Sequence, residues 1–199
     1  SGYASCHMKY SLGAPFTERF FELALSGDGT AKHPGGYVGE ITANSFMKRE
    51  FGAKLIEQVL PALDLTHVID TAGAYIPGHG TPTVILFGRH RPPVAGEVRT
   101  VMGIKGEPST PEDPAQGLVW TAILDQVDRA RSESDFVSVT DTSREVFGRH
   151  PWSIGGGGAS ELKGILEESS AGSLSGAIEE VGVFGISAAD EVLLGDNAS

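Results

Sequence analysis

The chain has 199 residues, of which 40% are hydrophobic, so it can form one domain with a buried core, with or without a small appendage. Its formal net charge of −11 comes from 15 Lys and Arg against 26 Asp and Glu, which argues against a module that holds nucleic-acid phosphates unaided. No run approaches the roughly 20 apolar residues of a membrane span, and the single cysteine, Cys6, excludes an internal disulfide. We therefore expect a cytoplasmic protein without a membrane segment, and no zinc site built on Cys6.

Helices and a strand are predicted in the N-terminal third of the chain. Residues 15–25 have a helical period, and Pro15 suits the first turn of a helix. The face predicted to be buried consists of Phe16, Phe20, Leu23 and Ala24. A strand is expected over 37–42, followed by a helix over 46–60. The buried stripe expected for this second helix is Phe51, Leu55, Ile56 and Val59.

The middle of the chain continues this alternation. Further strands are expected over 65–69, 81–87, 98–104 and 136–139, and a helix over 115–129. The inward residues of that helix are expected to be Leu118, Ala122 and Val127. The 81–87 segment is apolar enough to lie inside a sheet. Strands that alternate with helices predict an α/β sheet with helix crossovers.

The C-terminal part is predicted to be an appendage. Gly155 to Gly158 form an unbroken glycine run, which is typical of a flexible linker. A phosphate-binding loop would require a Lys and a Ser or Thr at fixed spacing, and the next basic residue, Lys163, lies at the wrong distance. A short acidic helix over 160–168 and a strand-like piece over 181–186 are expected to follow. We therefore expect a domain over 1–150, and over 151–199 a linker with the start of a small acidic segment.

Two loops are candidates for binding, because ligands of open α/β sheets lie at the carboxyl ends of the strands. In the 43–46 loop, Asn44 and Ser45 could meet a phosphate or a base edge, or simply cap the next helix. The 73–81 loop holds three glycines and a proline, which indicates special backbone geometry. Its Tyr75, Ile76 and Pro77 could offer an apolar wall to an extruded base, or Tyr75 could fold onto the core.

Other chemistry finds little support. His79 could act as a base or a metal ligand, but no matching histidine or carboxylate spacing accompanies it, so a hydrogen-bonding or exposed role is favoured. No G-x-S-x-G elbow or HExxH pair occurs in the chain. The positive residues of the first half cluster in sequence at Lys48, Arg49, Lys54, Arg89, His90, Arg91 and Arg99.

Several short motifs in order resemble the second half of the catalytic domain of the N6-adenine DNA methyltransferases. They are HPGG at 33–36, NSF at 44–46, KR at 48–49, FGAKL at 51–55, VID at 68–70 and TVIL at 83–86. Segments 101–120 and 148–162 are similar to the large phage-defence methyltransferases of the BREX/Pgl type. The resemblance implies a partial class I methyltransferase (Rossmann-like) sheet, with S-adenosylmethionine as cofactor and DNA as substrate.

The resemblance also implies which residues face the flipped adenine and the DNA. These candidates are Asn44, Ser45, Phe46, Lys48, Arg49, Tyr75, Ile76, Pro77, His79 and Thr81. Ile76 stands where the family often has a Phe. The family's glycine-rich cofactor loop and its Asn-Pro-Pro-Tyr motif do not occur in these 199 residues. We therefore expect no catalytic, cofactor or metal residue here, and an isolated chain that neither binds the cofactor nor methylates DNA.

Two functions follow from these patterns. In the first, the chain is a fragment of a DNA adenine methyltransferase whose partners are DNA, the rest of that polypeptide and other proteins of a defence system. In the second, it is a non-catalytic acidic module that keeps part of the fold and binds a partner protein. The sequence leaves the DNA recognition site open, because base specificity resides in groove contacts made elsewhere.

Overall fold

The structure, a computed structural model, describes residues 2–156, 162, 165–166 and 169–170, and it divides into two compact units, Ser1–Leu162 and Lys163–Ser199. In the second unit, residues 165, 166 and 169 are helical, within and just beyond the expected 160–168 helix. The end of the expected glycine linker and the strand-like 181–186 piece lie outside the described residues.

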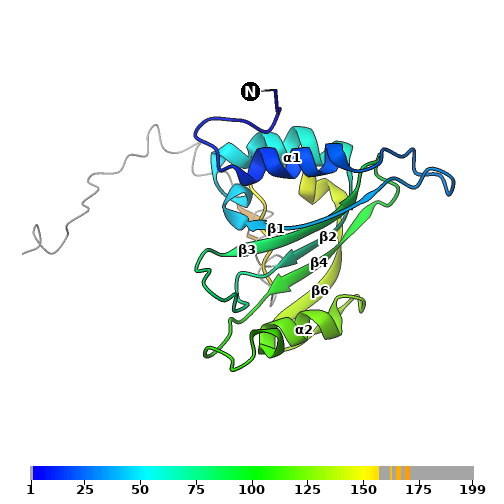
Figure 1. The fold of residues 1–199 in the computed structure, drawn as a ribbon. Helices are drawn as coiled ribbons and strands as arrows, with labels where there is room; N and C mark the ends of the chain where they lie inside the picture. The colour runs from blue at the N-terminus through cyan, green and yellow to red at the C-terminus, as the bar shows by residue number, and fades with distance from the viewer. Residues whose placement is uncertain (1, 157–161, 163–164, 167–168, 171–199) are drawn as a thin grey trace, which may run out of the picture. The chain divides into compact units, whose positions relative to one another are not determined.

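The first unit is built on a six-stranded mixed sheet in the order β1-β3-β2-β4-β6-β5 (Figure 1). The strands are β1 (Tyr37–Ala43), β2 (Asp64–Asp70), β3 (Thr83–Arg89), β4 (Glu97–Gly103), β5 (Ser132–Glu133) and β6 (Val137–Ser143). Strand β3 lies between β1 and β2 and runs antiparallel to both, so β1 and β2 are parallel to each other. Strand β4 is parallel to β2, and β6 is antiparallel to β4. The expected α/β class and the internal position of the 81–87 strand are confirmed.

Helices cover the two faces of the sheet unequally. Helix α1 (Gly13–Leu23) and the helical turns between β1 and β2 lie on one face, and α2 (Leu118–Gln126) lies on the other (Figure 1). The turns after β1 are η1 (Asn44–Met47), η2 (Glu50–Gly52), η3 (Leu55–Val59) and η4 (Leu60–Ala62). Two further short turns are η5 (Pro114–Gln116) and η6 (Arg144–Gly148). The parallel connection from β1 to β2 crosses one face of the sheet, but it consists of short helical turns and not of the single helix that was expected.

The 46–60 segment is not the regular helix that its period predicts. The chain bends back between η1 and η2 so tightly that a Cβ on Gly52 would lie 1.9 Å from the Phe46 carbonyl oxygen. Only glycine fits there, and the bend interrupts the helical hydrogen-bond ladder. The buried stripe is nevertheless close to the expected one, because Phe51, Leu55 and Ile56 are buried.

Helix α1 is rotated relative to the prediction. Phe16, Phe20 and Leu23 are exposed, and the buried residues are Ala14, Thr17, Glu18 and Phe21. The Glu18 carboxylate accepts hydrogen bonds from the backbone N–H groups of Ala4 and Ser5, at 3.0 and 2.8 Å. The prediction of the buried face was wrong because this polar anchor turns Phe21, not Phe20, toward the sheet.

The first unit also continues past residue 150, where the sequence indicated a boundary. Trp152 is 1% exposed and packs edge-on against Phe46 and Phe147, with ring centroids 5.6 and 5.0 Å away. Its backbone N–H donates to the Met47 carbonyl oxygen at 2.8 Å. In α2 the inward residues are Val119, Ala122, Ile123 and Gln126, while Leu118 is exposed, contrary to the prediction.

Candidate functional site

The two loops singled out in the sequence are the 43–46 loop and the 73–81 loop. They lie side by side at the end of the sheet where strands β1 and β2 finish. Because β1 and β2 are parallel, their carboxyl ends lie at that end, and β3 starts there with Thr83 paired to Ala43. The backbone N–H of Asn44 donates to the Pro82 carbonyl oxygen at 3.0 Å, which joins the two loops directly. Segments that are far apart in sequence thus form one continuous surface.

The turn after β1 offers polar and basic groups. Asn44 and Ser45 are half-buried, and neither side chain caps the turn that follows, since Ala43 holds the capping position. Lys48 and Arg49 are exposed, and among the described residues neither forms an ion pair. Phe46 is different, because it is 3% exposed and packs on Trp152. Its expected contact with DNA is corrected: Phe46 is a core residue.

The loop between β2 and β3 is closed at its neck and open at its tip. At the neck, the hydroxyl oxygens of Thr71 and Thr83 are 2.7 Å apart and buried. At the tip, the His79 N–H donates to the Ile76 carbonyl oxygen at 3.1 Å, and Gly78 between them has a φ of +68°. Proline followed by a left-handed glycine is the pattern of a tight type II turn. This turn holds His79 and Thr81 out into solvent, where both are exposed.

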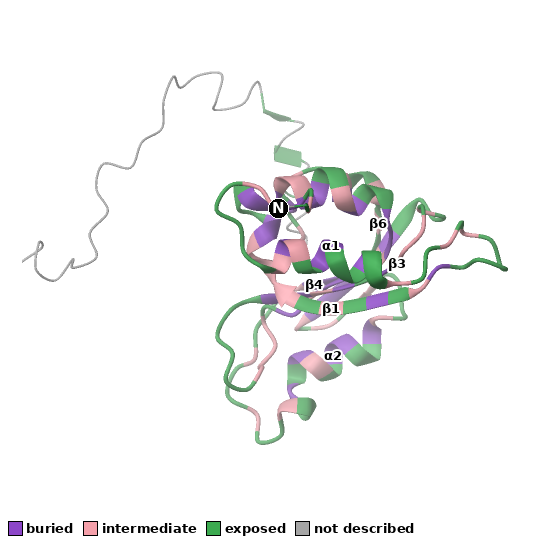
Figure 2. Cartoon of the chain, turned by 45° about the horizontal axis from the view of Figure 1, so that its top comes forward, coloured by how far each residue is buried: buried purple, intermediate pink, exposed green. Residues whose placement is uncertain are grey.

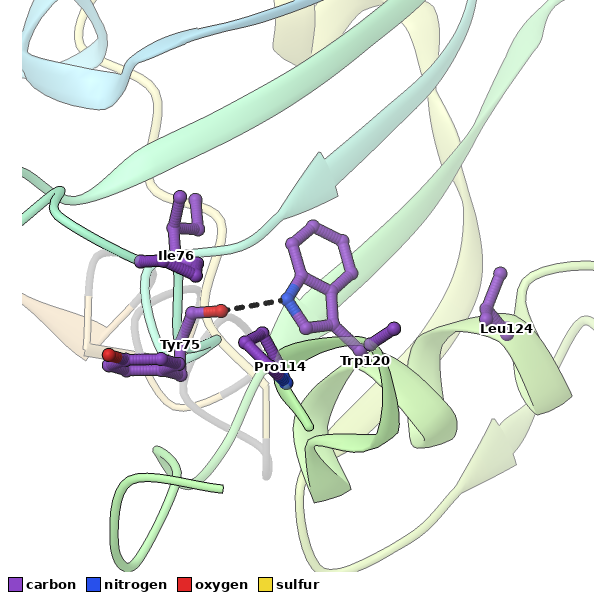
Figure 3. A pocket seen from close by; sticks show the side chains of 7 residues that line it. Tyr75, Ile76, Pro114, Trp120 and Leu124 are labelled. Atoms are coloured by element: carbon purple, nitrogen blue, oxygen red, sulfur yellow. Dashed lines mark hydrogen bonds between the residues drawn. The ribbon is translucent and has the colours of Figure 1, made fainter. Parts of the chain in front are cut away.

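An apolar pocket of about 350 Å³ lies between this loop and α2. The loop contributes Tyr75 and Ile76 (Figure 3) and Pro77 to its lining. Segment 114–124 contributes Pro114, Ala115, Trp120 and Leu124. The Ile76–His79 bridge forms a hairpin-like turn, and Tyr75 is half-buried at the pocket without being part of the buried core. The contribution of segment 114–124 to the pocket was not predicted from the sequence. Trp120 and Tyr75 are 45 residues apart, and no local pattern in 114–124 indicates that the two meet.

A half-buried carboxyl group, that of Asp70, lies where the loop begins. Burial raises the pKa of Asp70, while hydrogen bonds from the backbone of Ala72 and Gly103 and the nearby charge of Lys48 oppose that rise. The Asp70 carboxylate accepts the Ala72 N–H at 2.9 Å, which starts the loop in a fixed direction. No cluster of His, Cys, Asp and Glu able to hold a metal ion occurs among the residues that the structure describes.

Four of the remaining basic residues of the sequence cluster, Arg89, His90, Arg91 and Arg99, have partners within the chain, whereas Lys54 forms no ion pair among the described residues. Arg91 and Arg144 both bind the buried Asp64 carboxylate, at 2.7 and 3.2 Å. Arg99 pairs with Asp141 at 2.6 Å, and Arg89 stacks over the Tyr37 ring. The structure therefore separates Lys48 and Arg49, which adjoin the two loops, from arginines that hold the fold together.

These features define a ligand-binding type of site at the carboxyl ends of parallel strands in a mixed α/β sheet. The turn after β1 supplies its polar and basic groups, and the β2–β3 loop supplies its apolar part. The chain is 50% identical, over 96% of its length, to the adenine-specific methyltransferase PglX of Streptomyces coelicolor, and it spans 16% of the length of that relative. The resemblance predicted from the sequence, to adenine methyltransferases of the Pgl type, is confirmed. No protein-family model matches the chain.

A solved chain of a type I R-M system aligns with 96% of this chain and 41% of its own length, at 15% identity and a TM-score of 0.45. None of the helices within the described ranges has the length and apolar character required to cross a membrane.

Proposed function

We propose that this chain is the substrate-facing part of an adenine-N6 DNA methyltransferase that takes its methyl group from S-adenosylmethionine. The observation that carries the proposal is the 50% identity over 96% of the chain to an adenine-specific methyltransferase. The meeting of the two loops at one sheet edge supports it, because such an edge is where α/β enzymes hold their ligands. On this proposal the complete protein acts in the cytoplasm in phage defence, with other proteins of that system as partners.

The residues at the edge have distinct roles on this proposal. Lys48 and Arg49 neutralise DNA phosphates, for which exposed and unpaired cations are suited. Asn44 and Ser45 offer side-chain hydrogen bonds to a base or the backbone. Tyr75, Ile76 and Pro77 form an apolar wall for an adenine turned out of the duplex. His79 and Thr81 form the exposed rim of that wall.

The cofactor is held by another part of the polypeptide. The family's glycine-rich cofactor loop and its Asn-Pro-Pro-Tyr motif are absent from the sequence, so the groups that bind S-adenosylmethionine and the reacting amino group are not among these 199 residues. S-adenosylmethionine would supply the activated methyl group. The present chain would contribute the DNA-contacting and base-stacking surface alone.

The edge strand β1 supports the proposal that another part of the same polypeptide adds a strand to this sheet. Its register with β3 is continuous from Tyr37 to Ala43. Of the devices that protect a natural sheet edge, it carries one half-buried charged residue, Glu40, but no proline, lysine or bulge. Parts of α1 and β1 are exposed (Figure 2), and several of their exposed residues are large and apolar. They are Phe16, Phe20 and Leu23 of α1, and Tyr37 and Ile41 of β1. A further strand flanked by apolar segments would pair with β1 and cover them.

The proposal is tested by expressing a polypeptide that extends this segment to the full length of its relative. Incubation with S-adenosylmethionine and unmethylated DNA, followed by mass spectrometry of the nucleosides, should yield N6-methyladenine. In calorimetry, the 199-residue chain alone should give no heat of S-adenosylmethionine binding. A full-length protein that binds the cofactor but leaves adenine unmodified would contradict the proposal.

The net charge of −11 favours a second candidate, a non-catalytic acidic module that binds a partner protein. Such a module would bind a positively charged surface of its partner, and its own negative charge would repel DNA. The same experiment separates the two: a full-length protein without methylation or DNA binding, but with a stable protein partner, supports the module.

A further inference from the structure

The segment between β4 and α2 is fastened to the β2–β3 loop by one residue, Glu107. Its backbone N–H donates to the Gly73 carbonyl oxygen at 2.9 Å. Its carboxylate oxygens accept the N–H groups of Leu118 and Val119, at 3.0 and 3.1 Å. A carboxylate is favoured at the start of a helix, where N–H groups are otherwise unpaired. Glu107 therefore links the first turn of α2 to the beginning of the loop.

A second connection runs from the helix to the middle of the loop. The Trp120 indole N–H donates to the Tyr75 carbonyl oxygen at 3.1 Å, and the indole faces the loop (Figure 3). Gly73 also packs closely on Gly106, the residue before Glu107, since a Cβ at Gly73 would lie 3.0 Å from the Gly106 Cα atom. The segment 104–120 thus contacts the loop at Gly73 and at Tyr75.

The tip of the loop has no comparable support among the described residues. A Cβ built on Gly78 or Gly80 would meet no atom within 4 Å. Pro77, His79 and Thr81 are exposed. Glycine-rich backbone has high conformational entropy, so the position of such a tip depends on how firmly its base is held. The base is held by the Thr71–Thr83 neck and by Glu107 and Trp120.

We propose that Glu107 and Trp120 are positioning residues that fix the conformation of the β2–β3 loop, so that its apolar wall is ready for an unstacked nucleobase. This inference rests on the proposed function for the identity of the ligand. The pocket that results is apolar, and Trp120 itself lines it opposite Tyr75 and Ile76. The carboxylates of this segment, at Glu107, Glu112 and Asp113, would repel phosphate, which favours a base over the DNA backbone as the occupant.

The first test uses the 199-residue chain and does not depend on activity. Trp120→Phe keeps an aromatic ring but removes the N–H donor to the loop. Glu107→Gln leaves the backbone N–H that donates to Gly73, but it removes the charge and one of the two carboxylate acceptors that hold the first turn of α2. Loss of one hydrogen bond of about 0.5–1.5 kcal/mol should speed hydrogen exchange of the loop amides by roughly 2- to 10-fold. Leu118→Ala, an exposed change on the same helix, is the matched control and should leave the loop amides unchanged. Unchanged loop exchange in both variants, with global stability preserved in denaturation, would overturn the inference.

The second test uses the full-length protein and DNA with 2-aminopurine at the target adenine. Base extrusion raises 2-aminopurine fluorescence, so Trp120→Phe should lower that signal while DNA affinity stays near wild type. The kcat, measured on matched DNA with adenine at the target because 2-aminopurine has no 6-amino group to methylate, should fall as well. Faster loop exchange with an unaltered signal and kcat would reduce Trp120 to a structural role and sink the proposal. If the wild-type protein itself neither extrudes nor methylates adenine, the proposed function fails, while the exchange experiment still decides how the loop is held.

Discussion

Basic residues at the two ends of the central strands differ in whether they form ion pairs. At the end where β2 begins, Arg91 and Arg144 both bind Asp64, whose side chain is 1% exposed. At the end where β1 and β2 finish, Lys48 and Arg49 are exposed, without an ion pair among the described residues. A buried carboxylate fixes the first pair in place, whereas the second pair has no carboxylate partner among the described residues. The comparison shows that the availability of a basic side chain depends on whether a carboxylate of the chain already binds it.

The largest effect is expected where the charges are buried. Asp64→Ala should lower the free energy of unfolding by about 3 kcal/mol or more, because it leaves two arginines partly buried without their partner. Urea denaturation followed by circular dichroism measures this. Asp141→Ala, which removes the more exposed partner of Arg99, is the control and should cost about 1 kcal/mol or less. Equal losses in the two variants would break the contrast between the ends.

A smaller effect on stability, but a clear one on binding, is expected at the other end. Lys48→Ala with Arg49→Ala should change the free energy of unfolding by no more than about 0.5 kcal/mol, since both side chains are exposed. In the full-length protein, the salt dependence of DNA affinity should weaken by about one unit of slope per residue removed. Arg19→Ala, an exposed arginine on α1, is the matched control. An unchanged salt dependence would remove Lys48 and Arg49 from the DNA-binding surface.

The smallest effect concerns pH. Burial raises the pKa of Asp70 above its ordinary value of 3.8, so the folded chain keeps this proton where the unfolded chain has released it. Its contribution to stability is therefore present at low pH and is lost as pH rises from 3.8 through the raised pKa. Asp70→Asn keeps an acceptor for the Ala72 N–H but does not titrate. The stability of this variant relative to wild type should increase with pH over that interval, as measured by urea denaturation. A flat difference would show that Asp70 is not desolvated.

Strand positions were predictable because strands depend on local pattern. Each of the five longer strands overlaps its expected range, and β5, of two residues, was missed because it is too short to have a period. The buried face of α1 was not predictable. Phe16, Phe20 and Leu23 have the apolar spacing, yet Glu18 faces inward because its carboxylate binds two backbone N–H groups of the N-terminal segment. Such an anchor is a long-range contact that leaves no periodic signal.

The candidate site was partly predictable for the same reason. Both loops could be recognised from their glycines, proline and polar residues, and the structure joins them through Asn44 and Pro82. Phe46 was assigned to the DNA-binding surface through the resemblance carried by the NSF motif at 44–46, but it packs on Trp152, which lies beyond the predicted boundary. Trp120 was missed although it lines the pocket, since its partner Tyr75 is 45 residues away.

By itself, the sequence determined the class of fold, the strands and the resemblance to adenine methyltransferases, because these reside in local periodicity and in short ordered motifs. Tertiary structure alone decided which charges are available and which aromatic rings are buried. Asp64 forms ion pairs with Arg91 and Arg144, and Trp152 packs on Phe46; both are contacts between residues remote in sequence. Availability for a ligand depends on what a side chain already touches, and that is settled only when the chain has folded.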